Sequence, residues 1–331
     1  MKRLFIIGCP RSGSTWTMFL IAQHPDVVVC QHNRLFDALT GFREWFIRMK
    51  SHGVTGPRFG MSVVVPTAEK ERGEARGAKF LQLLPEDDFY TICRQAVSAV
   101  YDRIASHNPG AKVVVDKTPE NGRQGDFILR VFPDAYFLHI MRDPRAVSSS
   151  VMAAARSFEP NFPPHARGAA RMWLSDTIKG QEIGRLTSNY LEVRYESLKA
   201  NGPEELQRIY SWLGLPSDLA LCEKAVESST IDRMRPMTGG GHFRKGETDS
   251  WRGDLSSGDV RIVEYLAGDL MDELGYQRTL PPSRRKPLSV AYADTKRAVS
   301  QSLLQGVHRV KRGIASRLRR IRGETKSESA A

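Results

Sequence analysis

The order of extended and helical segments predicts an α/β fold built on a mostly parallel sheet. Short apolar runs rich in strand-forming residues, such as residues 4–7, 112–115 and 135–141, are separated by longer stretches with helical periodicity, such as residues 87–107. Turns containing Gly or Pro divide these segments. Strands that alternate with helices in this way usually form a parallel sheet covered by helices on both faces.

The same reasoning assigns the elements in chain order. Apolar residues recur three or four positions apart at Phe36, Leu39, Phe42 and Phe46, which indicates a helix. The predicted strands are residues 4–7, 27–29, 112–115, 135–141 and 190–194, and the predicted helices are residues 14–23, 35–49, 87–107, 122–132, 145–155, 166–186, 204–213 and 218–226. Residues 52–79 and 156–165 are rich in Gly, Pro or charge and are predicted to be loops, which either border a pocket or lie on the surface.

Length and charge predict one large body with a basic tail. The chain has 331 residues and a formal net charge of +12, but residues from Arg284 onward contain thirteen Lys or Arg and three Asp or Glu, which leaves +2 for the first 283 residues. We therefore expect one domain over residues 1–280 and a separate tail over residues 281–331. The four cysteines have no metal-like spacing, so no metal site is expected and a reducing, cytoplasmic compartment is favoured.

The first predicted strand leads into a loop suited to binding an anion. Gly8 and Pro10 end the strand, and Gly13 opens a helix, so that backbone N–H groups and the helix N-terminus face one point. The spacing Gly8-x-x-x-x-Gly13-Ser14-Thr15 is that of a nucleotide triphosphate loop in which Ser14 replaces the usual Lys. The expected fold is therefore P-loop-like, with three layers. A turn without a ligand is the alternative.

The missing lysine argues against a kinase or ATPase, because those enzymes use it to hold the β- and γ-phosphates. Arg11 is the strong cation of this loop. The site can therefore hold a phosphate-like group without being suited to MgATP hydrolysis.

Further candidate residues follow later strands, at the edge where open α/β sheets bind ligands. Arg142 follows one strand, and Ser150 stands eight residues later, so that both can contact one phosphate. The alternative is that Arg142 caps a helix or pairs with Asp143. Tyr195 follows the last strand and is either a binding residue or part of the core.

A Gly-rich basic loop follows near residue 240. Three consecutive glycines precede Arg244, Lys245 and Gly246, and Trp251 comes shortly after them. Such a loop gains order when it binds a ligand, although a Lys/Arg pair in a loop is also common on a solvated surface.

Together these segments resemble the sulfotransferases that use 3′-phosphoadenosine 5′-phosphosulfate (PAPS). Residues 10–16 are similar to the family's 5′-phosphosulfate loop, with Ser14 in place of Thr. Arg142 with Ser150 resembles its 3′-phosphate site, residues 195–198 resemble its Tyr-Glu-Asp/Asn-Leu segment, and residues 244–251 resemble its phosphate-closing motif. The matched segments occur in family order over residues 4–252.

The resemblance implies a role for each matched residue. PAPS is the expected donor and 3′-phosphoadenosine 5′-phosphate (PAP) the product. The 5′-phosphosulfate would be held by Arg11 and the amides of Ser12, Gly13, Ser14 and Thr15. The adenine would lie near Trp16 and Tyr195. The 3′-phosphate would be held by Arg142, Ser150, Arg244, Lys245 and Gly246.

Sulfonyl transfer needs a cation beside the leaving 5′-phosphate and a base for the acceptor's proton. Lys117 stands at the end of a strand and resembles the family's lysine there, although a surface lysine is the alternative; Arg11 adds positive charge. Two bases remain open. His32 lies twenty-one residues after Arg11, the spacing of the catalytic Glu in tyrosylprotein sulfotransferases, whereas Asp116 occupies the place of the Glu before Lys-Thr-Pro in heparan-type enzymes.

The tail is predicted to be a basic amphipathic helix. Its apolar residues recur every three or four positions, at Val299, Leu303, Val307, Val310, Ile314, Leu318 and Ile321. Together with the basic residues of 284–322, this pattern predicts binding to an anionic membrane surface. A membrane-peripheral protein with a lipid-linked acceptor would follow. The alternative is that the apolar face of the helix packs on protein. Nucleic-acid binding is not expected, because Tyr292 is the tail's one aromatic residue.

A hydroxyl-bearing glycan, lipid or small molecule is the expected acceptor. The competing functions are a P-loop kinase and a non-catalytic, membrane-associated nucleotide-binding protein. The sequence alone does not predict the oligomeric state.

Overall fold

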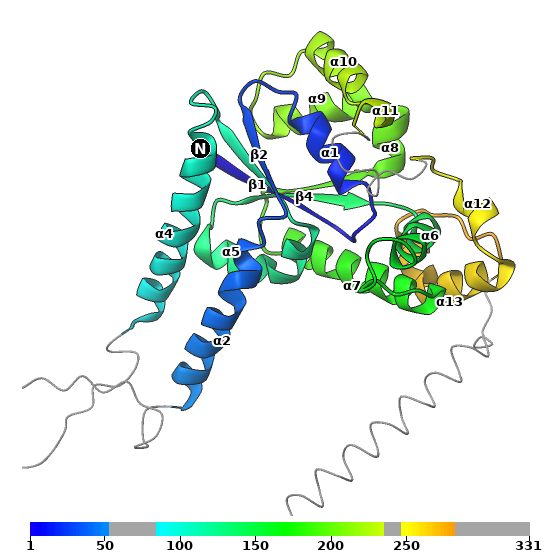
Figure 1. The fold of residues 1–331 in the computed structure, drawn as a ribbon, viewed down its shortest axis with the longest axis horizontal. Coiled ribbons are helices and arrows are strands. Elements are labelled where there is room, and N and C mark those ends of the chain that lie inside the picture. Colours follow the sequence, from blue (N-terminus) through cyan, green and yellow to red (C-terminus); the bar gives the residue numbers. More distant parts are fainter. Residues whose placement is uncertain (53–83, 235–245, 282–331) are drawn as a thin grey trace, which may run out of the picture.

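The computed structural model describes residues 1–52, 84–234 and 246–281 (Figure 1). Its core is a five-stranded parallel sheet. The strand order is β2-β3-β1-β4-β5, and every neighbouring pair is parallel. The strands are β1 Lys2–Ile7, β2 Val27–Gln31, β3 Val113–Lys117, β4 Tyr136–Met141 and β5 Tyr190–Arg194. The predicted α/β, P-loop-like fold with a mostly parallel sheet is confirmed.

The central strand β1 divides the sheet into two halves. It pairs with β3 on one side, where Phe5 lies opposite Asp116, and with β4 on the other, where Ile7 lies opposite His139. Leu4 to Ile7 are completely buried because helices cover both faces. The chain reaches β2 and β3 on one side of β1 before crossing to β4 and β5 on the other. Such a switch point opens a crevice at the carboxyl ends of the strands.

Helices form layers on both faces of the sheet (Figure 1). One face packs mainly on α1 Ser14–Ile21 and α9 Gly202–Trp212 through a cluster that includes Leu4 and Ile6 of β1. The other face packs on α4 Glu86–Ala105 and α5 Gly125–Val131 through Phe5, Phe89 and Phe127. The remaining helices are α2 Leu35–His52, α6 Pro144–Ala155, α7 Ala166–Gly184, α8 Tyr195–Ala200, α10 Leu219–Ser228, α11 Ile231–Met234, α12 Trp251–Asp254 and α13 Ser257–Glu273.

Two differences from the sequence prediction affect the surroundings of the site. The helix expected over residues 122–132 begins instead as a 3₁₀ helix, η1 Pro119–Gln124, and becomes α-helical at Gly125. An ion pair between Arg123 and Asp176 of α7, with Nε and Oδ1 2.7 Å apart, fixes η1. Helix α13 was not predicted; it packs with α6 and α7 around Trp173, Val263 and Met271.

Several predicted features lie outside the described residues. These are the loop at residues 53–79, Arg244, Lys245 and the amphipathic tail. Among residues 1–52, 84–234 and 246–281, no helix is both long enough and apolar enough to cross a membrane.

Candidate active site

The phosphate loop between β1 and α1 depends on two glycines with positive φ. Gly8 has φ 141°, and a Cβ there would lie 2.4 Å from the Ile140 carbonyl oxygen. Gly13 has φ 104°, and a Cβ there would lie 2.3 Å from a ring carbon of Tyr195. A side chain at either position would clash and strain the backbone. The glycine spacing seen in the sequence therefore reflects close packing as well as a tight turn.

The side chains of this loop face the second predicted phosphate site. Arg11 Nε donates a hydrogen bond of 3.1 Å to Ser150 Oγ on α6. The Ser12 hydroxyl is buried and has no hydrogen-bond partner among the described residues. The structure thus brings together Arg11 and Ser150, which are 139 positions apart in sequence. Buried donors without a partner are uncommon, and an anion would satisfy this one.

Arg142, at the end of β4, points toward the phosphate loop. One of its terminal nitrogens donates to the Glu247 carbonyl at 2.7 Å, and the other to the Arg11 carbonyl at 3.4 Å. Its Nε is buried without a partner among the described residues. Because Arg142 retains an unsatisfied donor, it is suited to receive a phosphate oxygen.

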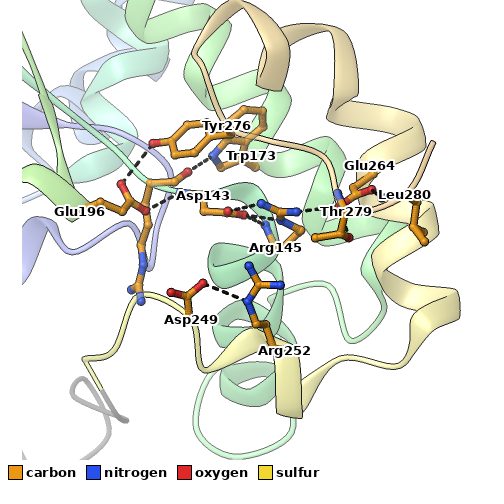
Figure 2. Close-up of polar contacts among 11 residues, drawn as sticks. Asp143, Arg145, Trp173, Glu196, Asp249, Arg252, Glu264, Tyr276, Thr279 and Leu280 are labelled. Atoms are coloured by element: carbon orange, nitrogen blue, oxygen red, sulfur yellow. Dashed lines mark hydrogen bonds and ion pairs between the residues drawn. The ribbon is translucent and has the colours of Figure 1, made fainter. Parts of the chain in front are cut away.

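The alternative reading, in which Arg142 pairs with Asp143, is not what the structure shows. Asp143 caps α6 by accepting from the Arg145 N–H at 2.8 Å, and its carboxylate also pairs with the Arg145 guanidinium at 2.6 Å. On its other side, Arg145 contacts Glu264 of α13 at 2.7 Å (Figure 2). Among the described residues, no carboxylate therefore forms an ion pair with the Arg142 guanidinium.

The turn that carries Arg142 is held by further buried contacts (Figure 2). Glu196 accepts from the Asp143 N–H at 2.9 Å and from the Tyr276 hydroxyl at 3.3 Å. Trp173 Nε1 donates to the Arg142 carbonyl at 2.9 Å. These contacts fix the backbone of Arg142, so that its side chain is presented from a rigid support.

Tyr195 and Trp16 lie beside the phosphate loop. The Tyr195 ring packs against Gly13, and its hydroxyl donates to the Gly246 carbonyl at 2.8 Å. Trp16 is only 6% exposed and donates through Nε1 to the Ser229 carbonyl at 2.9 Å. The two ring centroids are 5.5 Å apart in an edge-on arrangement. Trp16 is thus largely a core residue, and Tyr195 connects the loop to Gly246.

Lys117 and His32 meet at the ends of adjacent strands. Lys117 Nζ lies 2.6 Å from His32 Nε2, and the His32 N–H donates to the Lys117 carbonyl at 3.1 Å. Lys117 is 1% exposed, and burial lowers its pKa to about 8, while Glu120 raises it and Arg11 lowers it further. The reading of Lys117 as a surface lysine is wrong, because the side chain is buried.

Asp116 points to the opposite face of β3, as the alternation of side chains along a strand requires. Its carboxylate accepts hydrogen bonds from Tyr101 at 2.7 Å, Asn33 at 2.9 Å and Thr118 at 2.8 Å. Burial raises the pKa of Asp116, although these donors lower it. The carboxylate therefore ties α4 to the segment after β2 and does not line the cavity beside Lys117.

A cavity of about 310 Å³ brings the phosphate loop together with His32 and Lys117, whereas Arg142, Ser150 and Tyr195 do not line it. It is lined by Pro10, Arg11, Ser14, Thr15, His32, Arg34, Lys117, Pro119, Glu120, Phe158, Glu159, Asn161 and Phe162. The loop over residues 156–165 therefore does border the pocket. Glu120 was missed by sequence reasoning; its place directly after Lys117-Thr118-Pro119 was the available signal. Within the described ranges, no group of three His, Cys, Asp or Glu could hold a metal ion.

Comparison with known proteins identifies the family to which the chain belongs. The model of the sulfotransferase family matches residues 3–218, from the start of β1 to the residue before α10. The chain belongs to the sulfotransferase family. This sulfotransferase is 25% identical over 306 residues to nodulation protein NoeE of Sinorhizobium fredii, covering 85% of this chain and 67% of NoeE.

Two further similarities support the same family and fold. The sulfotransferase is 22% identical over 322 residues to the protein-tyrosine sulfotransferase of Drosophila melanogaster, covering 92% of this chain and 58% of that protein. The sulfotransferase domain of the Synechococcus PCC 7002 olefin synthase has a TM-score of 0.50 at 18% identity, covering 85% of this chain and 96% of that domain. At this identity the structural likeness supports the fold.

Proposed function

We propose that this sulfotransferase moves a sulfonyl group from PAPS to a hydroxyl acceptor and releases PAP. The observation that carries the proposal is the hydrogen bond between Arg11 of the phosphate loop and Ser150 of α6, since Arg142 also contacts the Arg11 carbonyl. This contact links the loop proposed for the 5′-phosphosulfate to the residues proposed for the 3′-phosphate, which supports a donor that carries both groups. The buried donors on Ser12 and Arg142 fit such a ligand, because each would gain an oxygen acceptor.

In the proposed reaction the acceptor oxygen attacks sulfur in line with the leaving 5′-phosphate. A new S–O bond forms to the acceptor, and the S–O bond to the phosphate breaks with its electron pair moving to the phosphate oxygen. Lys117 and Arg11 line the same cavity and are proposed to stand beside the leaving phosphate, where a fixed cation would lower the barrier by stabilising the developing negative charge. With a pKa of about 8, Lys117 is mostly protonated at neutral pH.

His32 is the base that the geometry favours. Its side chain lines the cavity with Lys117, whereas the Asp116 carboxylate is buried on the other face of β3 with three hydrogen-bond donors. To accept a proton, Nε2 of His32 must be free of Lys117 Nζ. Contact between Lys117 and the leaving phosphate would release it, so donor binding and base activation would be linked.

The acceptor is proposed to enter the part of the cavity that is lined by the segment after α6, where the Phe158 ring lies 5.5 Å from the Arg11 guanidinium. Phe158 and Phe162 supply apolar surface there, and Glu120, Glu159 and Asn161 supply hydrogen-bonding groups. This mixture suits a hydroxylated sugar, a phenol or the head of a lipid. The names of the relatives include a protein-tyrosine sulfotransferase, which makes a phenolic hydroxyl one candidate.

Residues 1–280 are proposed as the catalytic domain and residues 281–331 as an anchor for an anionic membrane. The helical spacing of apolar residues and the high basic charge of residues 284–322 support this reading. A cytoplasmic, membrane-peripheral location and a lipid-linked acceptor would follow from it.

The test of this function is transfer from sulfur-labelled PAPS into a cell lysate, with identification of the labelled product. Wild-type protein should label an acceptor, and Lys117→Ala protein, at matched PAPS occupancy, should label it far less. Equal labelling by both proteins would contradict the proposed chemistry. Tight PAP binding without labelling of any acceptor would favour the non-catalytic nucleotide-binding alternative.

A further inference from the structure

Residues 246–251, here called the strap, run from Tyr195 and Arg142 to the first residue of α12. At one end, the Gly246 carbonyl accepts from the Tyr195 hydroxyl at 2.8 Å and the Glu247 carbonyl accepts from Arg142 at 2.7 Å. At the other end, the Arg145 guanidinium stacks over the Trp251 ring at 4.1 Å. The strap is therefore attached at both ends to residues that flank the proposed 3′-phosphate site.

Tyr195 contacts the phosphate loop, Arg142 and the strap. One side of its ring packs against Gly13 of the phosphate loop, and the Arg142 guanidinium lies over the ring, 4.1 Å from its centroid. Its hydroxyl reaches the strap. The side chain is 3% exposed, and burial raises the pKa of Tyr195, so the hydroxyl keeps its proton and donates at neutral pH.

The orientation of Arg142 depends on the strap. Its bond to the Glu247 carbonyl is the shorter of its two hydrogen bonds, since the bond to the Arg11 carbonyl is 3.4 Å. Gly246 has φ 69°, and glycine adopts this and other backbone conformations easily. The hydrogen bond from the Tyr195 hydroxyl therefore helps to hold the backbone in this one conformation. If Gly246 moved, the Glu247 carbonyl would move with it and Arg142 would lose its main acceptor.

We propose that Tyr195 is a positioning residue: its hydroxyl fixes the strap so that Glu247 orients Arg142 toward the 3′-phosphate of the donor. The proposal rests on the proposed function. It assigns the hydroxyl an indirect role, which is separate from any contact between the Tyr195 ring and the adenine. Tyr195 thereby controls the preference for nucleotides that carry a 3′-phosphate.

The experiment compares wild type, Tyr195→Phe and a matched control, Tyr210→Phe. Tyr195→Phe keeps the ring on Gly13 and removes only the bond to Gly246. Tyr210→Phe also removes one buried hydroxyl that donates to a backbone carbonyl, but that carbonyl belongs to Leu20 near the end of α1 and not to the strap. The measurements are the dissociation constants of PAP and AMP and the dissociation rate of PAP.

Tyr195→Phe should weaken PAP binding and speed PAP dissociation by about threefold to tenfold, the effect of one net hydrogen bond, and leave AMP binding unchanged. Tyr210→Phe should leave the ratio of PAP to AMP affinity at the wild-type value. An equal loss of PAP and AMP binding by Tyr195→Phe would assign it a merely structural role and overturn the proposal, as would no change at all.

Hydrogen exchange in the nucleotide-free protein provides a second readout. Amides of residues 246–251 should exchange faster in Tyr195→Phe than in wild type or Tyr210→Phe. Unchanged exchange of these amides would contradict the proposal that the Tyr195 hydroxyl fixes the strap. If wild type bound PAP no better than AMP, the proposed function would fail, and the exchange result would still show whether Tyr195 holds the strap.

Discussion

Lys117 Nζ and His32 Nε2 lie 2.6 Å apart across the adjacent strands β3 and β2. The contact joins the residue proposed to stabilise the leaving group to the residue proposed as the base. Since Lys117 is buried, its proton is held less tightly than that of an exposed lysine, and its pKa falls to about 8.

The pH dependence of the reaction should reflect this shift. The protonated form of Lys117 is the useful one, so kcat/KM for PAPS, which reports the free enzyme, should fall as the pH rises through about 8. Lys117→Arg keeps the charge to higher pH and should remove this limb while lowering the maximum rate. A rate that stays flat up to a pH of about 10 in wild type would contradict the role of Lys117, since even an unperturbed lysine titrates near there.

Loss of the Lys117 cation should affect turnover more than binding. Lys117→Ala should lower kcat by about 100-fold or more, because removing one fixed group that stabilises transition-state charge commonly costs that much. PAP affinity should change much less, since Arg11 and Arg142 remain. Parallel losses of kcat and PAP affinity would indicate that Lys117 only binds the nucleotide.

The two candidate bases should separate when mutated. His32→Ala should lower kcat by about 100-fold or more and abolish any rate dependence on a group that titrates near neutrality. Asp116→Asn should mainly lower stability, by about 1–3 kcal/mol, because an amide cannot accept from all of Tyr101, Asn33 and Thr118. Rates and denaturation curves on the same proteins distinguish these effects. A fully active His32→Ala enzyme would transfer the assignment to Asp116.

The residues at the ends of the strands could be predicted from the sequence, but the contacts between their side chains could not. Parallel strands place their carboxyl ends at one edge, so His32, Lys117 and Arg142 were expected to converge there. Their pairing depends on strand order: β2 and β3 are neighbours, which no local pattern specifies. The alternation of side chains along β3 already separates Asp116 from Lys117, and this signal could have been used to rank the two bases.

Long-range ion pairs were beyond the reach of sequence reasoning. Arg145 meets Glu264 across 119 residues, and the pair fixes the turn beside Arg142. Helix α13 supplies Glu264, and nothing in a local motif connects that helix to β4. The cavity wall formed by Glu120 likewise depends on the 3₁₀ geometry of η1, whereas the sequence periodicity indicated an α-helix starting later.

The tail makes a prediction that is independent of catalysis. Full-length protein should sediment with anionic vesicles, because each Lys or Arg near an anionic surface contributes about 1 kcal/mol. A chain ending at Pro282 should sediment with anionic vesicles much less than the full-length protein does. Both proteins should sediment with neutral vesicles less than the full-length protein does with anionic ones. Equal binding of both chains to anionic vesicles would show that the tail is not the anchor.

Arg142 should carry much of the nucleotide preference. Arg142→Ala removes the buried guanidinium whose Nε has no partner in the described part of the chain. The variant should lose about 1.5–3 kcal/mol of PAP binding, the usual contribution of a hydrogen bond to a charged group, and little AMP binding. Arg145→Ala is not a suitable control because it would also disturb Asp143 and Glu264. Calorimetric titration of both nucleotides measures the difference.

The most direct test of the account is the affinity of the wild-type protein for PAP, AMP and MgATP, measured by calorimetry under one set of conditions. The phosphate loop with Arg11 and the neighbouring site at Arg142 and Ser150 predict that PAP binds at least about tenfold more tightly than either competitor. Equal affinity for all three nucleotides, or a preference for MgATP, would contradict the assignment of this cleft to PAPS.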